Sequence, residues 1–96
     1  MKKFMFLYKG FIMPTSEIGQ SWMEWFGEVG DKMADSGNPM TGGVEVTPDD
    51  VTEIELGTES LTGYSIVNAE SMEAAVALAK TNPMITSVIV YELARM

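Results

Sequence analysis

Residues Lys3 to Lys9 read Lys-Phe-Met-Phe-Leu-Tyr-Lys, a run in which odd and even positions alike are apolar. Side chains of a β-strand alternate between its two faces, so a strand of this composition requires an apolar cover on both sides. Gly10 and Pro14 end the run, because both residues interrupt regular structure. We therefore predict a central strand over 3–9.

A long amphipathic helix is predicted next, from Thr15 or Ser16 to Ser36. Thr15 and Ser16 suit a helix N-cap, and Gly37 with Asn38-Pro39 suits a C-terminal stop. Apolar residues recur at three- and four-residue steps along the segment: Ile18, Trp22, Trp25, Phe26, Val29 and Met33. At helical pitch these residues share one face, so the helix is expected to pack against the strand.

The same signals predict the remaining elements. Val44 to Thr47 and Val51 to Leu56 alternate apolar and polar residues, a pattern typical of an exposed hairpin. Gly63 to Ala69 predicts a further strand, and Ser71 is placed to cap a second helix that runs to about Lys80. Ser87 to Leu93 predicts a final strand that is again apolar on both faces.

The order of these elements indicates a fold. With one hairpin strand counted in the sheet, the order is the βαββαβ arrangement of a ferredoxin-like α+β protein, a single domain over 1–96. Its two helices cover one face of an antiparallel sheet and leave the other face open. An open apolar face of that size exceeds what soluble monomers normally expose. We therefore expect a homodimer, packed sheet against sheet around a shared core or cavity.

The composition excludes several kinds of chemistry. The 96 residues contain no cysteine and no histidine, which removes disulfides, thiolate ligands, a nucleophilic cysteine and His-dependent triads. The usual transition-metal ligands are missing as well, and the acidic side chains of the first helix lie on a convex surface that lacks enclosing oxygens. No metal and no cofactor is predicted.

Charge and hydropathy indicate which partners are disfavoured and where in the cell the protein is expected. A net charge of −8 disfavours binding to nucleic acid or to an anionic membrane surface. The apolar run after Met1-Lys2-Lys3 stops at Lys9, too short for a signal core or a membrane span. We expect a cytoplasmic protein.

Six residues are candidates for a ligand site. Tyr8, Trp22, Trp25 and Tyr64 could line a cavity between helix and sheet that suits an aromatic ligand; packing in the core is the alternative interpretation. Lys9 ends a strand and Asn38 follows the first helix, so both could hold an anionic group at the pocket mouth. For Lys9, simple solvation is the alternative.

Several stretches resemble the YCII-related family, some of whose members are named for an Asp-Gly-Pro-Phe motif. They are Trp22-Met-Glu-Trp-Phe-Gly-Glu, Gly37-Asn-Pro, Gly63-Tyr-Ser-Ile-Val-Asn-Ala-Glu-Ser, and Ala74-Ala-Val-Ala-Leu-Ala-Lys running into Asn82-Pro83. Together they span nearly the whole chain in order. The resemblance implies a small dimeric α/β-barrel protein, related to muconolactone isomerases and small monooxygenases.

The resemblance does not extend to a catalytic site. The better-studied branch of the family has a proposed His and Asp pair, and this sequence has no histidine. The region of the Asp-Gly-Pro-Phe motif reads Glu55-Leu-Gly-Thr-Glu-Ser-Leu-Thr-Gly63 instead. No catalytic residue is therefore assigned. The leading hypothesis is a dimeric module that binds a small aromatic or anionic molecule or a partner, and the alternative is a cofactor-free isomerase or monooxygenase using Tyr or Lys acid–base chemistry.

Overall fold

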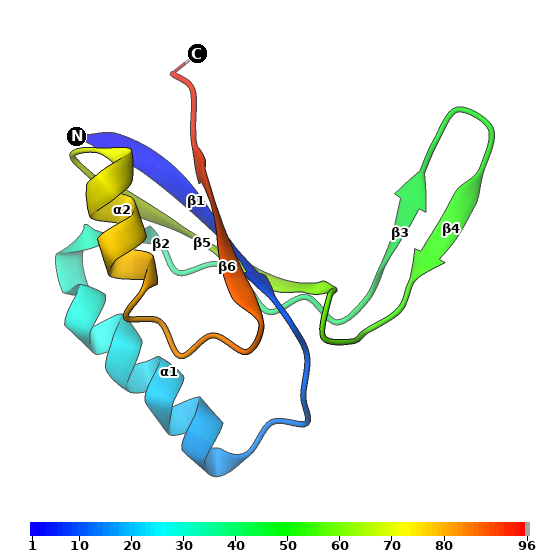
Figure 1. Cartoon of the computed structure of the whole chain (residues 1–96), viewed down its shortest axis with the longest axis horizontal. Helices are drawn as coiled ribbons and strands as arrows, with labels where there is room; N and C mark the ends of the chain where they lie inside the picture. The colour runs from blue at the N-terminus through cyan, green and yellow to red at the C-terminus, as the bar shows by residue number, and fades with distance from the viewer. Residues whose placement is uncertain (96) are drawn as a thin grey trace.

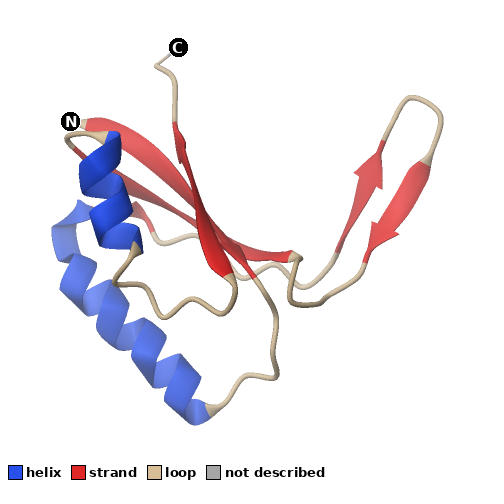
Figure 2. Ribbon diagram, viewed as in Figure 1, coloured by secondary structure: helices blue, strands red, loops and turns tan. Residues whose placement is uncertain are grey.

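The protein is described by a computed structural model that covers residues 1–95. Its elements are β1 (Lys2–Lys9), α1 (Ser16–Val29), a 3₁₀ turn η1 (Gly30–Lys32), β2 (Met33–Asp35), β3 (Gly43–Val46), β4 (Val51–Ile54), β5 (Leu61–Ala69), α2 (Met72–Ala79) and β6 (Ser87–Glu92). Strands β2, β5, β1 and β6 form an antiparallel sheet in that order. Both helices lie on one face of this sheet (Figures 1 and 2). The chain is therefore a ferredoxin-like α+β fold with an open sheet, not a closed barrel.

The covered face of the sheet carries the core. Phe4, Phe6 and Tyr8 alternate along β1 toward the helices, and Phe4 stands opposite Val67 of β5. The buried apolar residues are Phe4, Phe6, Tyr8, Trp25, Val29, Val67, Ala69, Ala75 and Ala79. Trp25 is fixed further by its indole Nε1, which donates to Thr81 Oγ1 at 2.9 Å.

Both helices begin where the sequence predicts. Thr15 Oγ1 accepts a hydrogen bond from the backbone N–H of Ile18 at 3.2 Å. Ser71 Oγ accepts from the N–H of Ala74 at 3.1 Å. Each cap satisfies a backbone donor that the first turn of a helix leaves free.

The predicted end of the first helix is wrong. The helix stops at Val29 rather than Ser36, because Gly30 takes a positive φ of 57° that ends the α-helical path. Met33, which continues the apolar spacing of the helix, instead lies in β2 opposite Val67. Its side chain packs on the same core from a strand. The spacing of apolar residues alone does not distinguish a Met33 on the helix from a Met33 on a strand.

The predicted place of the hairpin in the sheet is also wrong. The short strand β2, at the edge of the sheet, takes the place of the second strand in the ferredoxin-like pattern. Strand β3 pairs only with β4. We call residues 43–54 the arm, since every residue of β3 and β4 is exposed and the hairpin stands clear of the sheet (Figure 1). The radius of gyration is 14.3 Å, against about 12.5 Å for a compact domain of this length.

The second face of the sheet is apolar, as the sequence predicts, and neither helix covers it (Figure 2). It carries Met5 and Leu7 of β1, which stand opposite Ile66 and Tyr64 of β5. On the other side, Ile89 and Tyr91 of β6 complete the face. No helix among residues 1–95 is long and apolar enough to span a bilayer.

Candidate functional site

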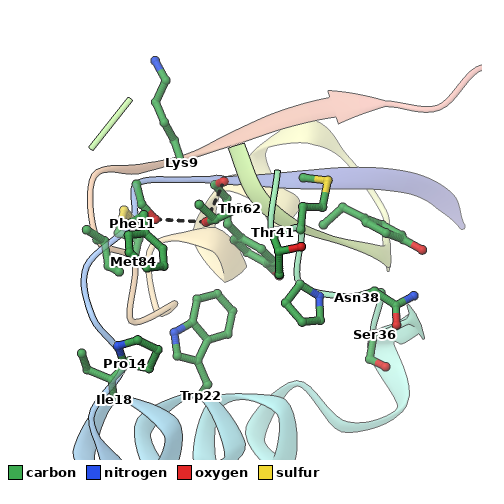
Figure 3. Close-up of a pocket in the computed structure, with 18 of the residues that line it drawn as sticks. Lys9, Phe11, Pro14, Ile18, Trp22, Ser36, Asn38, Thr41, Thr62 and Met84 are labelled. Atoms are coloured by element: carbon green, nitrogen blue, oxygen red, sulfur yellow. Dashed lines mark hydrogen bonds between the residues drawn. The ribbon is translucent and has the colours of Figure 1, made fainter. Parts of the chain in front are cut away.

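A cavity of about 830 Å³ opens at the end of the sheet where β1 stops (Figure 3). One wall is formed by α1 and the adjoining ends of β1 and β5. Four loops close the rest: those after β1 and β2 and those before β5 and β6. The lining residues are Tyr8, Lys9, Gly10, Phe11, Ile12, Pro14, Ile18, Trp22, Phe26, Gly30, Met33, Ser36, Gly37, Asn38, Pro39, Met40, Thr41, Leu56, Thr62, Gly63, Tyr64, Met84 and Ile85. Its volume falls within the range of small-molecule sites.

Aromatic rings form the wall shared by helix and sheet. Ile18, Trp22 and Phe26 recur at four-residue steps along α1, which brings all three side chains to the cavity. The Tyr8 ring meets the Trp22 ring edge to face, with centroids 4.7 Å apart and an interplanar angle of 83°. Edge-to-face contacts are favourable for aromatic pairs, so this wall is an ordered surface on which a flat ligand could pack.

The loop after β2 forms a second wall and is held tightly to β5. Gly37 has a φ of 76°, and a Cβ at this position would lie 1.7 Å from the carbonyl oxygen of Tyr64. Pro39 forms a bridge with Gly63, and the N–H of Met40 donates to Thr62 O at 2.9 Å. Only a glycine allows this approach.

Tyr8 has a fixed hydroxyl rather than a free one. It donates to Ser65 Oγ at 2.8 Å, and Ser65 Oγ donates in turn to the carbonyl oxygen of Ser36 at 2.8 Å. Burial raises the pKa of Tyr8 to about 12, although the hydrogen bond with Ser65 acts in the opposite direction. The phenol therefore remains protonated at neutral pH.

This raised pKa predicts a specific loss of stability in alkali. The folded state keeps the Tyr8 proton that the unfolded chain loses near the ordinary pKa of 10.0. The stabilisation is complete below pH 10 and disappears as the pH rises toward 12. Over that window the wild type should lose about 2–3 kcal/mol relative to Tyr8→Phe. Urea unfolding of both proteins at several pH values measures the difference; parallel stability curves would contradict the assignment.

Lys9 does not face the cavity. Its backbone lines the rim, but its side chain points away from Trp22 in Figure 3. The ammonium Nζ lies 3.5 Å from Glu59 Oε1 at the base of the arm. The expectation that Lys9 holds an anion at the pocket mouth stays a prediction, and in this geometry its ammonium is paired with Glu59 instead.

The other predicted site residues lie in three different places relative to the cavity. Trp22 and Asn38 line the cavity, with Asn38 on the loop that faces Trp22 across the pocket (Figure 3). Tyr64 touches the rim, but its register opposite Leu7 assigns its side chain to the open face of the sheet. Trp25 does not line the cavity, because it is only 2% exposed and lies in the core.

Sequence reasoning missed the loop residues of the site. Phe11 and Ile12 come from the loop after β1, and Met84 and Ile85 come from the loop before β6. Thr62 fixes the start of the first of these loops, since its hydroxyl donates to Gly10 O at 3.0 Å (Figure 3). Apolar residues directly after the strand-ending Gly10 and after Pro83 were the available signal, because loops seldom retain such residues without a packing role.

The fold and the cavity define a ferredoxin-like protein with an apolar, aromatic-walled pocket. No protein-family model matches the sequence, and no curated protein matches it. Among solved structures, the chain is similar to the 5-chloro-2-hydroxyhydroquinone dehydrochlorinase TftG from Burkholderia phenoliruptrix AC1100, in complex with 2,5-dihydroxybenzoquinone. The TM-score is 0.58 at 14% identity, over 98% of this chain and 95% of that one. At this identity the likeness shows the fold.

Proposed function

We propose that this protein is a dimeric small-molecule-binding module whose cavity holds a flat aromatic or quinoid ligand. The observation that carries the proposal is the aromatic wall of the cavity, in which Tyr8, Trp22 and Phe26 stand together. Single-ring and fused-ring ligands pack well against such surfaces.

The polar groups of the cavity agree with an uncharged or weakly anionic ligand. No Asp or Glu lines the part of the pocket formed by residues 1–95, and the ammonium of Lys9 points away. The lining includes neutral polar side chains, those of Ser36, Asn38, Thr41 and Thr62. A few such groups among apolar walls orient a ligand without an ion pair.

The similar structure supports the same ligand class. TftG has this fold and was solved with 2,5-dihydroxybenzoquinone bound. The resemblance of the sequence to the YCII-related family supports the dimer rather than the ligand, since those proteins are dimeric barrels of the ferredoxin-like type. In our proposal the open apolar face of this chain packs against the same face of a second copy.

The same geometry favours binding over Tyr or Lys acid–base catalysis. A base near neutral pH needs a pKa near the working pH. Tyr8 has its pKa raised to about 12, and its hydroxyl is already bonded to Ser65. Lys9 faces Glu59 on the other side of the strand.

A thermal-shift screen against quinones, hydroquinones, aromatic acids and lactones tests the proposal. A ligand at about 100 times its dissociation constant adds about 2.7 kcal/mol. In a domain of this size that should raise the melting midpoint by about 10 °C or more. No shift with any member of the screen would contradict the proposed ligand class.

Two variants locate the binding. Trp22→Leu removes a ring from the cavity wall and should weaken binding of a hit at least about tenfold, since the ring supplies both area and a directed aromatic contact. Met23→Leu is the matched control, because Met23 is the next residue of α1, is 76% exposed and lies outside this cavity. Equal affinities in the two variants would place the ligand elsewhere.

A further inference from the structure

The arm exposes apolar side chains that nothing in the described chain covers. Val44, Val46, Val51 and Ile54 are between 47% and 69% exposed. An isolated two-stranded hairpin is only marginally stable in water. The arm stands apart from the sheet (Figure 1), so a partner surface would stabilise it.

The total solvent-exposed area of the chain indicates how large the partner surface is. The chain exposes 6773 Å², whereas a compact monomer of its mass exposes about 5,400 Å². The excess of about 1,300 Å² exceeds the roughly 800 Å² that each partner contributes to a standard interface. A second protein surface of domain size fits this excess, and a small ligand does not.

The two faces of the arm differ. Residues directly opposite each other in an antiparallel pair share a face, and Val46 pairs with Val51 while Val44 pairs with Glu53. The valine face therefore holds the three valines together with Glu53. Glu45 and Thr52 pair on the opposite face, which is the more polar one.

Charge separates the arm from the open sheet face. Residues 41–59 contain six of the fourteen acidic residues and no Lys or Arg. On the open face, β1 carries Lys3 and Lys9, and β5 and β6 carry no charged side chain. Glu92 of β6 stands opposite Phe4 on the covered face, and the carboxylate at the sheet edge is that of Asp35 in β2, opposite Ile66. Lys9 is paired with Glu59, but no salt bridge holds Lys3 within residues 1–95. An acidic, apolar arm and a lysine-bearing, apolar face are complementary.

We propose that the arm of one copy clasps a second copy of this chain, with its valine face against the Lys3 end of the partner's open sheet and Glu53 near the partner's Lys3. This inference rests on the dimer of the proposed function and adds the contact that orients it. The arm leaves the sheet at the Lys9 end, where Lys9 stands opposite Leu61, and Lys3 lies at the other end. The two copies therefore pack with their sheet ends reversed.

The dimensions agree with this arrangement. Strand β3 of the arm spans Gly43–Val46, which is about 13 Å at the rise of a β-strand, and stacked sheets lie about 10 Å apart. The arm stands on the side of the sheet away from both helices (Figure 1). It therefore reaches a second sheet stacked on the open face.

Sedimentation velocity over a concentration series tests the clasp through the dimer dissociation constant. The triple variant Val44→Thr, Val46→Thr and Val51→Thr keeps β-branched side chains and should raise that constant at least about tenfold. Glu53→Lys should raise it as well, and adding Lys3→Glu should restore part of the loss. Glu45→Lys, the same charge change on the opposite face, is the matched control and should have a smaller effect.

A cross-link provides evidence that does not depend on weakened association. The chain has no cysteine, so Val46→Cys and Lys3→Cys chains can be mixed, oxidised and weighed as intact disulfide heterodimers. Gln20→Cys on α1 replaces Lys3→Cys in the control mixture. Efficient pairing of 46 with 3, but not with 20, supports the clasp.

The outcomes separate this inference from the proposed function. A dimeric wild type whose association is unchanged in the valine and Glu53 variants, with no preferred 46–3 cross-link, overturns the clasp and leaves the sheet-to-sheet dimer standing. A monomeric wild type at micromolar concentration overturns both the clasp and the proposed dimer. Ligand binding is measured independently of either result.

Discussion

Gly37→Ala is expected to destabilise the protein by about 3 kcal/mol or more. A left-handed backbone costs a residue with a Cβ about 1–2 kcal/mol, and Gly37 has a φ of 76°. The added Cβ would lie 1.7 Å from the carbonyl oxygen of Tyr64, so the loop has to leave β5 to accommodate it. Urea unfolding followed by tryptophan fluorescence measures the loss.

Gly27→Ala is the control for this substitution. Gly27 lies inside α1, and a Cβ built there meets nothing within 4 Å. Alanine at this position should stabilise the protein by up to about 1 kcal/mol, because glycine is a poor helix former. A loss below about 1 kcal/mol for Gly37→Ala would show that the loop does not require its close approach to β5.

Phe6→Ala is expected to cost about 3–5 kcal/mol, the usual range for removing a buried phenylalanine ring. Phe6 is fully buried at the centre of β1, between Ser65 of β5 and Val90 of β6. Its ring lies 6.4 Å from that of Trp25. The substitution leaves a cavity under the helices, and a small domain has little stability to spare.

Chemical denaturation compared with Met23→Ala tests this second prediction. Met23 is 76% exposed on α1, so its truncation should change stability by no more than about 0.5 kcal/mol. If Phe6→Ala lost less than about 1.5 kcal/mol, the sheet face beneath the helices would not be the main core.

Much of the fold can be predicted from periodicity and caps. The strand over 3–9 and the two N-caps were found because their signals are local: an apolar run, or a hydroxyl residue before an amphipathic segment. The junction after Val29 was missed because Met33 keeps helical spacing while belonging to β2. The hairpin was placed in the sheet because its alternation specifies strands but not their neighbours.

The site could be predicted only in part. Trp22 was found because an aromatic residue on the apolar face of a helix marks a contact surface. The direction of the Lys9 side chain could not be predicted, since a residue that ends a strand can face either side of it. Phe11 and Met84 reach the cavity from loops, whose paths depend on close approaches such as that of Gly37 to β5.

The binding of a flat aromatic or quinoid ligand in the cavity is tested most directly by the two indole N–H signals of the protein in a ¹⁵N-resolved NMR titration. Trp22 lines the cavity, whereas the indole of Trp25 donates to Thr81 in the core, and Trp22→Phe assigns the signals. Titration with the best hit of the screen should shift the Trp22 signal in a saturable manner and leave that of Trp25 nearly unchanged. A saturating ligand that leaves the Trp22 signal in place would contradict the account.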